Sequence, residues 1–115
     1  MKKYELTANT KNVCGKTLFQ IKALVNFGNV KAGELGGYIE KEGNLSHDGN
    51  AWVYDNAEIY GDAEIYGNAC ICGTACVYDY ARICDDAWIY GNARIYGTAC
   101  VDDSTKVYGN TKINF

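Results

Sequence analysis

The 115-residue sequence predicts an all-β protein, a single-stranded parallel β-helix shaped as a triangular prism of about four coils, with an N-terminal β-hairpin cap. Two observations predict this fold. Eleven consecutive copies of a six-residue pattern, Asn/Asp-Ala-x-Ile/Val-Tyr-Gly, run from Asn50 to Phe115 without insertion or deletion. Ahead of them, residues 4–7 and 17–24 alternate apolar and polar side chains around a turn at residues 12–16, which is typical of a hairpin.

Within one repeat, the residue types indicate a short strand followed by a corner. Positions two and four, such as Ala57 and Ile59, are apolar and lie two residues apart, so they share one face of a strand, while positions three and five face the other way. Gly or Asp at position six and Asn or Asp at position one tolerate the left-handed backbone that a sharp corner requires. Such units can bury their aliphatic side chains only if successive turns of the chain stack.

Three repeats per turn give a coil of 18 residues. An aliphatic residue with a small residue two positions earlier resembles the bacterial hexapeptide-repeat family, whose members form left-handed parallel β-helices. The match covers residues 50–115. The left hand is what the resemblance implies, because general rules for crossover connections favour the right hand.

The organisation we expect is one compact domain in three parts. Residues 1–28 form the hairpin cap, residues 29–49 a distorted first coil or junction, and residues 50–115 the regular β-helix. Extending the repeat backwards into the junction places Gly33, Ile39 and Leu45 at position two. The same register places Leu35, Lys41 and His47 at position four.

Charge and composition exclude several functional classes. The net charge is −3; residues 1–49 carry seven lysines against five acidic residues, and residues 50–115 carry four basic against nine acidic residues. Neither part has the basic face of a general nucleic-acid-binding protein. Without a long apolar run or the apolar core of a signal peptide, we expect a cytoplasmic protein with no membrane association, whose six cysteines follow the repeat as free thiols.

The first face of the prism carries the main candidate site. Residues 18 apart stack on one face, so positions three and five bring both tryptophans together with tyrosines. Trp and Tyr dominate interface hot spots and rarely form a large exposed stripe on a monomer. We interpret the stripe as an oligomer interface, with a ligand or partner-protein surface and a plain stiffening ladder as alternatives. The candidate residues are Trp52, Tyr54, Cys70, Cys72, Trp88, Tyr90 and Tyr108.

Metal binding is not predicted, although two groups of side chains carry metal-ligand atoms. The pair Cys70 and Cys72 lies on one strand without a histidine, which cannot give tetrahedral zinc geometry alone. Four aspartates fall at one corner of adjacent coils, where a calcium-like cation or plain solvated carboxylates are the alternatives. These four are Asp85, Asp86, Asp102 and Asp103.

Catalytic residues are not predicted either, with His47 as a weak candidate. It is the single histidine, it falls where the register expects an aliphatic side chain or a distorted turn, and imidazole titrates near neutral pH. The family resemblance implies homotrimers and, for many members, acyl transfer from acetyl-coenzyme A. This chain has no protruding loop in the repeats, and one histidine excludes the three-histidine site of the related carbonic anhydrases.

The whole chain is similar to small hexapeptide-repeat proteins of phages and prophages of Gram-positive bacteria. The resemblance lies in Leu-Gly-Gly-Tyr-Ile-Glu at residues 35–40 and Gly-Asn-Ala-Trp-Val-Tyr at residues 49–54. It implies a non-enzymatic, oligomeric phage protein in the cytoplasm of a bacterial host that binds a host protein or small ligand without a cofactor, such as a counter-defence inhibitor. A small trimeric acyltransferase dependent on acetyl-coenzyme A and a structural assembly unit are the alternatives.

Overall fold

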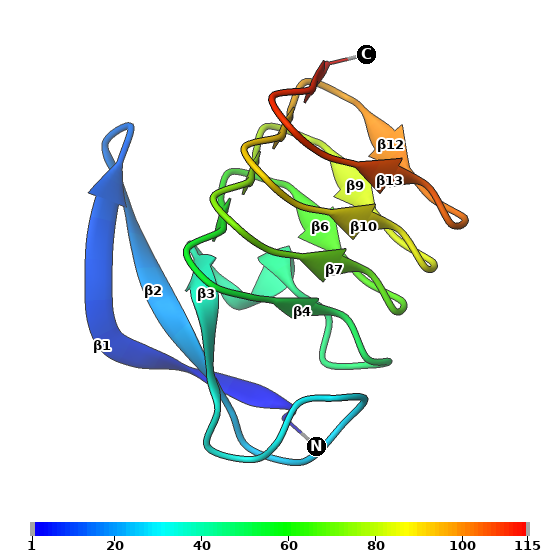
Figure 1. Ribbon diagram of the computed structural model, residues 1–115. Coiled ribbons are helices and arrows are strands. Elements are labelled where there is room, and N and C mark those ends of the chain that lie inside the picture. The colour runs from blue at the N-terminus through cyan, green and yellow to red at the C-terminus, as the bar shows by residue number, and fades with distance from the viewer. Residues whose placement is uncertain (1, 115) are drawn as a thin grey trace.

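The computed structural model describes residues 2–114 and is a β-solenoid with a hairpin at its N-terminal end (Figure 1). Each repeat contributes one two-residue strand at positions three and four. These strands are β4 (Trp52–Val53), β5 (Glu58–Ile59), β6 (Glu64–Ile65), β7 (Cys70–Ile71), β8 (Cys76–Val77), β9 (Arg82–Ile83), β10 (Trp88–Ile89), β11 (Arg94–Ile95), β12 (Cys100–Val101), β13 (Lys106–Val107) and β14 (Lys112–Ile113).

The strands stack as three parallel sheets, one per face of the prism. The first face is β4-β7-β10-β13, the second contains β5-β8-β11-β14, and the third is β6-β9-β12. Each strand pairs with the strand 18 residues further along, as Trp52 pairs with Cys70. The predicted parallel β-helix of about four coils is therefore confirmed, and the stacked coils agree with the left-handed form.

The repeat determines the interior almost completely. All nine alanines at position two, from Ala51 to Ala99, are at most 1% exposed, and the aliphatic residues at position four are equally buried as far as Ile95. Between coils, the outward positions three and five donate backbone hydrogen bonds, as the Cys70 and Cys72 amides do to the next coil at 3.0 and 2.9 Å. Because the interior is nearly the same in every coil, the side chains that distinguish one part of the surface from another are the outward ones.

Aspartate replaces glycine at four of the corners, and the structure explains why it is tolerated there. The backbone has positive φ between 55° and 62° at all four, a conformation that costs most side chains energy. In three of them the carboxylate Oδ2 accepts the N–H of the residue 18 further on, at 3.0–3.1 Å, which offsets that cost. The four residues are Asp55, Asp79, Asp85 and Asp103.

The N-terminal hairpin is present and continues the second face beyond the first coil. Strands β1 (Tyr4–Val13) and β2 (Lys16–Ala23) pair antiparallel around a two-residue turn, Cys14-Gly15, with positive φ at both residues. This turn geometry matches the natural twist of a hairpin. Strand β3 (Leu35–Ile39) then pairs antiparallel with β2 and parallel with β5, so the sheet order is β1-β2-β3-β5-β8-β11-β14.

The register expected for residues 29–49 is wrong by two residues. Ile39 pairs with Ile59, and Leu45 with Ile65, so both occupy position four and not position two. The chain then takes eight residues, in place of six, to reach the next position four at Val53. A two-residue insertion preserves the alternation of side chains along a strand, so the apolar pattern alone does not reveal it.

The insertion forms the loop that closes the first coil, after the 3₁₀ turn η1 (Glu42–Asn44). Lys3, only 3% exposed, reaches this loop and its Nζ donates to the carbonyl of Ala51 at 2.7 Å. His47 also lies in this loop, which agrees with the distorted turn and not with the inward-pointing position, the two alternatives that the register left open. None of the helices in the described part of the chain is long and apolar enough to cross a membrane.

Candidate binding site

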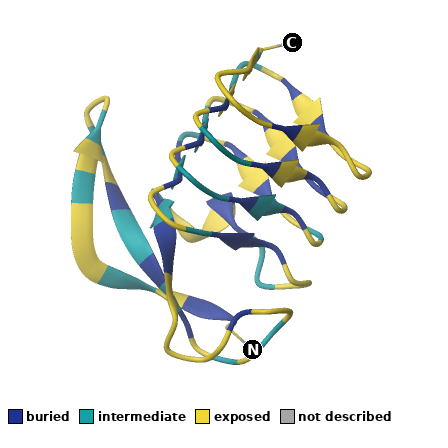
Figure 2. Cartoon of the chain, viewed as in Figure 1, coloured by how far each residue is buried: buried dark blue, intermediate teal, exposed yellow. Residues whose placement is uncertain are grey.

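The two tryptophans lie on one face, as predicted, but only one of them is accessible. The ladder Trp52, Cys70, Trp88 and Lys106 is in register on β4, β7, β10 and β13. Trp52 is 0% exposed, whereas Trp88 is 47% exposed. Figure 2 shows the same contrast, with β4 buried and β10 facing solvent. The prediction that Trp52 belongs to an exposed aromatic stripe is therefore wrong.

Residues from the N-terminal part of the chain cover Trp52. The rings of Phe27 and Tyr4 meet it edge-on, with centroids 5.3 and 6.2 Å from its own. The backbone at Gly36 is so close that a Cβ there would lie 2.8 Å from Trp52 Cζ2. The sequence indicated that position three faces outward, but it gave no signal that another segment would pack over it.

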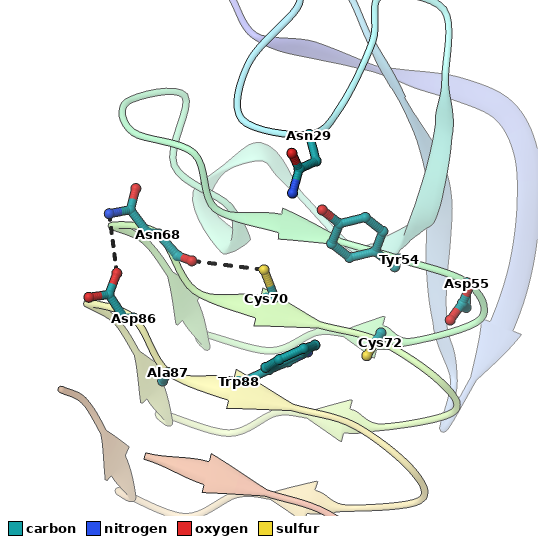
Figure 3. A pocket seen from close by; sticks show the side chains of 9 residues that line it. All are labelled: Asn29, Tyr54, Asp55, Asn68, Cys70, Cys72, Asp86, Ala87 and Trp88. Carbon is teal, nitrogen blue, oxygen red and sulfur yellow. Dashed lines mark hydrogen bonds between the residues drawn. The ribbon is translucent and has the colours of Figure 1, made fainter. Parts of the chain in front are cut away.

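Beside the covered tryptophan, the first face is hollowed into an open groove of about 360 Å³ (Figure 3). Tyr54 lies on one side of it and Trp88 on the other, with the small side chains of Cys70 and Cys72 between them. The groove exists because thiols occupy the coil between two coils that carry aromatic rings. Its full lining is Asn29, Tyr54, Asp55, Asn68, Cys70, Cys72, Asp86, Ala87 and Trp88.

The thiols and the tyrosine of the groove are uncharged near neutral pH. Burial raises the pKa of the Cys70 thiol, which is also near Cys72, and burial likewise raises the pKa of Cys72. Burial raises the pKa of Tyr54 to about 12. Because the thiolate is the nucleophilic form of cysteine, both thiols are poor nucleophiles.

Two carboxylates supply the charge, one at each end of the groove (Figure 3). Asp86 Oδ1 accepts the side-chain amide of Asn68 at 3.3 Å, and Asp55 Oδ2 accepts the Gly73 N–H at 3.1 Å. Those bonds each engage one oxygen of the carboxylate. Among the described residues that line the groove there is no lysine, arginine or histidine, so its electrostatic character is negative.

The aromatic surface continues past the groove toward the C-terminal coils. Trp88 packs against Tyr90 with ring centroids 5.7 Å apart, and Tyr90 stacks on Tyr108 at 5.4 Å. Lys106 Nζ lies 5.7 Å from the centroid of the Trp88 ring, from the coil beyond the groove. Tyr108 is 59% exposed. We refer to Trp88, Tyr90 and Tyr108 as the aromatic cluster.

The aspartate corner is only partly assembled as the sequence suggested. The carboxylates of Asp85, Asp102 and Asp103 all lie within 4.8 Å of one another and are exposed. Asp86 does not belong to this group, and its carboxylate accepts a hydrogen bond from Asn68 at the groove. Asp85 already accepts the backbone N–H of Asp103 at 3.1 Å, which accounts for the proximity of two of the three without a cation.

His47 is held by hydrogen bonds at both ring nitrogens. Its Nδ1 accepts the backbone N–H of Lys3 at 3.0 Å, so Nε2 carries the proton and donates to Glu42 at 2.8 Å. The ring also stacks on Tyr4, with centroids 4.1 Å apart. This arrangement anchors the N-terminal strand to the first coil and leaves no nitrogen lone pair free to accept a substrate proton.

The structure thus adds residues to the site that the sequence analysis did not select. Asn29 lies in the N-terminal part of the chain, and no local pattern connects it to the repeats. Asp55 and Asn68 are corner residues by pattern and Ala87 is an interior one, so their place along the groove depends on which neighbouring side chains are small. The sequence indicates Asp86 only as a metal candidate.

Comparison with known proteins gives no identification. No protein-family model matches the chain, and no curated protein matches it.

Proposed function

We propose that this chain is a non-enzymatic binding protein whose aromatic cluster contacts another protein chain. The observation that carries the proposal is the exposure of Trp88 and Tyr108, at 47% and 59%, on adjacent coils of one rigid face. Large aromatic side chains are the residue types most enriched at the energetic centres of protein interfaces. Rigid display on a sheet also lowers the entropy that binding must overcome.

The chemistry of the candidate catalytic groups supports a binding role over an enzymatic one. Both nitrogens of His47 are engaged in structural hydrogen bonds. The groove thiols have raised pKa values and are poor nucleophiles. Acyl transfer from acetyl-coenzyme A needs a general base, and His47 is the one histidine in the sequence.

The resemblance of the sequence supports more specific parts of the proposal. It favours a phage or prophage protein, acting in the cytoplasm of a bacterial host as a homotrimer, that binds a host protein and inhibits a defence system. The aromatic cluster is then either the contact between copies of this chain or the contact with the host protein. Solution mass separates these two roles.

The test compares the parent protein with the double variant Trp88→Ser/Tyr108→Ser by analytical ultracentrifugation and by affinity capture from bacterial extract. The matched control is Tyr80→Ser, because Tyr80 is 65% exposed and lies outside the cluster. Loss of oligomer mass in the double variant assigns the cluster to self-association, and loss of a captured protein assigns it to a partner. If neither the mass nor the captured proteins differ from those of the Tyr80 control, the proposal is wrong.

A further inference from the structure

We propose that the groove between Tyr54 and Trp88 receives the side chain of an arginine from the partner protein, an inference that rests on the proposed function. The groove offers the three features that a guanidinium recognises: an aromatic face, flanking carboxylates and room for a flat group. Each feature follows from named residues of the first face.

The room arises from the side chain that interrupts the aromatic ladder. Where tyrosines stack on successive coils elsewhere in this protein, their ring centroids lie 5.0–5.4 Å apart. Cys70 and Cys72 stand on the coil between Tyr54 and Trp88, which are two coils apart, or about 10 Å at the usual strand spacing. That is the spacing of the strands, and the open groove of about 360 Å³ that these side chains line leaves room for one flat group beside Trp88.

The charge of the groove selects a cation. Asp86 and Asp55 flank it at opposite ends, and each uses one carboxylate oxygen in the hydrogen bonds described above (Figure 3). Glu34 is close enough to Tyr54 to help raise the pKa of its hydroxyl, which places a third negative charge near the Tyr54 side of the groove. An anionic ligand such as a phosphate or carboxylate would meet repulsion here, whereas a guanidinium would be attracted.

Arginine fits better than lysine because its guanidinium is planar. It stacks on aromatic rings and donates to a carboxylate through two N–H groups, while an ammonium is a compact and strongly hydrated charge. The Trp88 ring already has one cation near it, since Lys106 Nζ lies 5.7 Å from its centroid. That contact belongs to the coil beyond, and Lys106 does not line the groove.

The openness of the site favours an arginine on a protein surface over a free small molecule. Small-molecule sites enclose most of their ligand, typically about 70–90% of its surface. Here Trp88 is half exposed, and the groove merges with Tyr90 and Tyr108 on the same face. A partner that inserts one arginine would cover the neighbouring tyrosines with the rest of its contact surface.

The test is an NMR titration of the folded chain with three matched probes: N-acetylarginine amide, its uncharged isostere N-acetylcitrulline amide, and N-acetyllysine amide. We expect the arginine probe to shift the Trp88 indole N–H resonance saturably and to bind about tenfold more tightly than citrulline. Asp86→Asn should weaken arginine binding about fivefold or more, since the charged hydrogen-bond partner is lost. Glu64→Gln, which removes an exposed carboxylate on the third face, is the control and should leave binding unchanged.

Several outcomes overturn the inference: equal binding of arginine and citrulline, stronger binding of lysine, or an Asp86→Asn variant that binds as the parent does. The amide spectrum of each variant shows whether it is folded, and an exposed carboxylate should be replaced without unfolding. If the arginine probe does not bind while Trp88→Ser still abolishes capture of the partner, the proposed function stands and the proposal that the groove receives an arginine is wrong. If the probe binds but capture does not depend on Trp88, the proposed function fails and the groove recognises a free planar cation.

Discussion

Replacing the two tryptophans one at a time should show that they have different roles, although they occupy the same position of the repeat. Both occupy position three of a repeat on the first face, 36 residues apart. Trp52 is fully covered by the N-terminal residues, and Trp88 is half exposed. We therefore expect Trp52→Ala to destabilise the fold severely, and Trp88→Ala to act chiefly on binding.

The magnitudes follow from what each ring contacts. Truncating a buried tryptophan to alanine costs about 3–5 kcal/mol, and the loss of the edge-on contacts of Trp52 with Phe27 and Tyr4 is part of that cost. Trp88 buries about half of its surface, so its truncation should cost about 1–2 kcal/mol. With about 4 °C per kcal/mol for a domain of this size, the melting temperature should fall by about 12–20 °C for Trp52→Ala and about 4–8 °C for Trp88→Ala.

Urea unfolding followed by circular dichroism and by tryptophan fluorescence measures the difference. In Trp52→Ala the remaining fluorophore is Trp88, which reports on the central coils, so the two signals also show whether the solenoid unfolds in stages. Trp52→Phe keeps most of the volume and should cost less than about 1.5 kcal/mol. Equal destabilisation by the two alanine variants, within about 1 kcal/mol, would refute the reasoning that the N-terminal segment covers one ring alone.

Three further predictions concern the N-terminal part and the thiols. Gly36→Ala should destabilise the fold by about 1–3 kcal/mol, because a Cβ there would lie 2.5 Å from the Val53 carbonyl oxygen. Chemical denaturation measures this against the control Gly43→Ala, whose Cβ would meet nothing within 4 Å, and equal effects of the two variants would contradict the close packing at Gly36. Burial lowers the pKa of Lys3 to about 8, so between pH 8 and its ordinary value of 10.5 the unfolded state binds more protons and the Lys3 contribution to stability rises with pH. The unfolding free energy of the parent minus that of Lys3→Met should accordingly rise by up to about 1.4 kcal/mol per pH unit in that window, and a constant value would exclude a depressed pKa. Subtracting the variant removes the contribution of the tyrosines and cysteines, which titrate in the same range. Burial, with Glu58 nearby, raises the pKa of Cys76 to about 11, so a thiol reagent at pH 8 should modify this cysteine at least about tenfold more slowly than the exposed Cys100. Mass spectrometry of the labelled peptides measures the two rates, and equal rates would contradict the burial of Cys76.

Most of the fold could be predicted from the sequence because the repeat ties each position to one environment. An apolar residue at positions two and four has nowhere to go but the interior, and glycine or aspartate at position six meets the backbone requirement of the corner. The hairpin was also predictable from alternation and from its turn residues. The two-residue shift at Ile39 and Leu45 was not, because it leaves the alternation of side chains unchanged.

The candidate site was less predictable, because it depends on contacts between distant parts of the chain. The repeat correctly stacked Trp52, Cys70 and Trp88 in one ladder. It could not show that Phe27 covers the first of them, or that Asn29 lines the adjacent groove. Such contacts arise in tertiary packing, which the local periodicity of a sequence does not report.

The N-terminal segment therefore has a consequence for the first face as well as for the second face, whose sheet it continues. By burying Trp52, it removes one aromatic side chain from the exposed surface and confines that surface to Trp88, Tyr90 and Tyr108. Asn29, which directly follows that segment, also lines the groove. The groove thus lies at the boundary between the covered and the open coils, where a small side chain, Cys70, interrupts the ladder. Stability of the N-terminal segment and the shape of the groove are physically coupled at this boundary, so loosening that segment should alter the groove before it disturbs the distal coils.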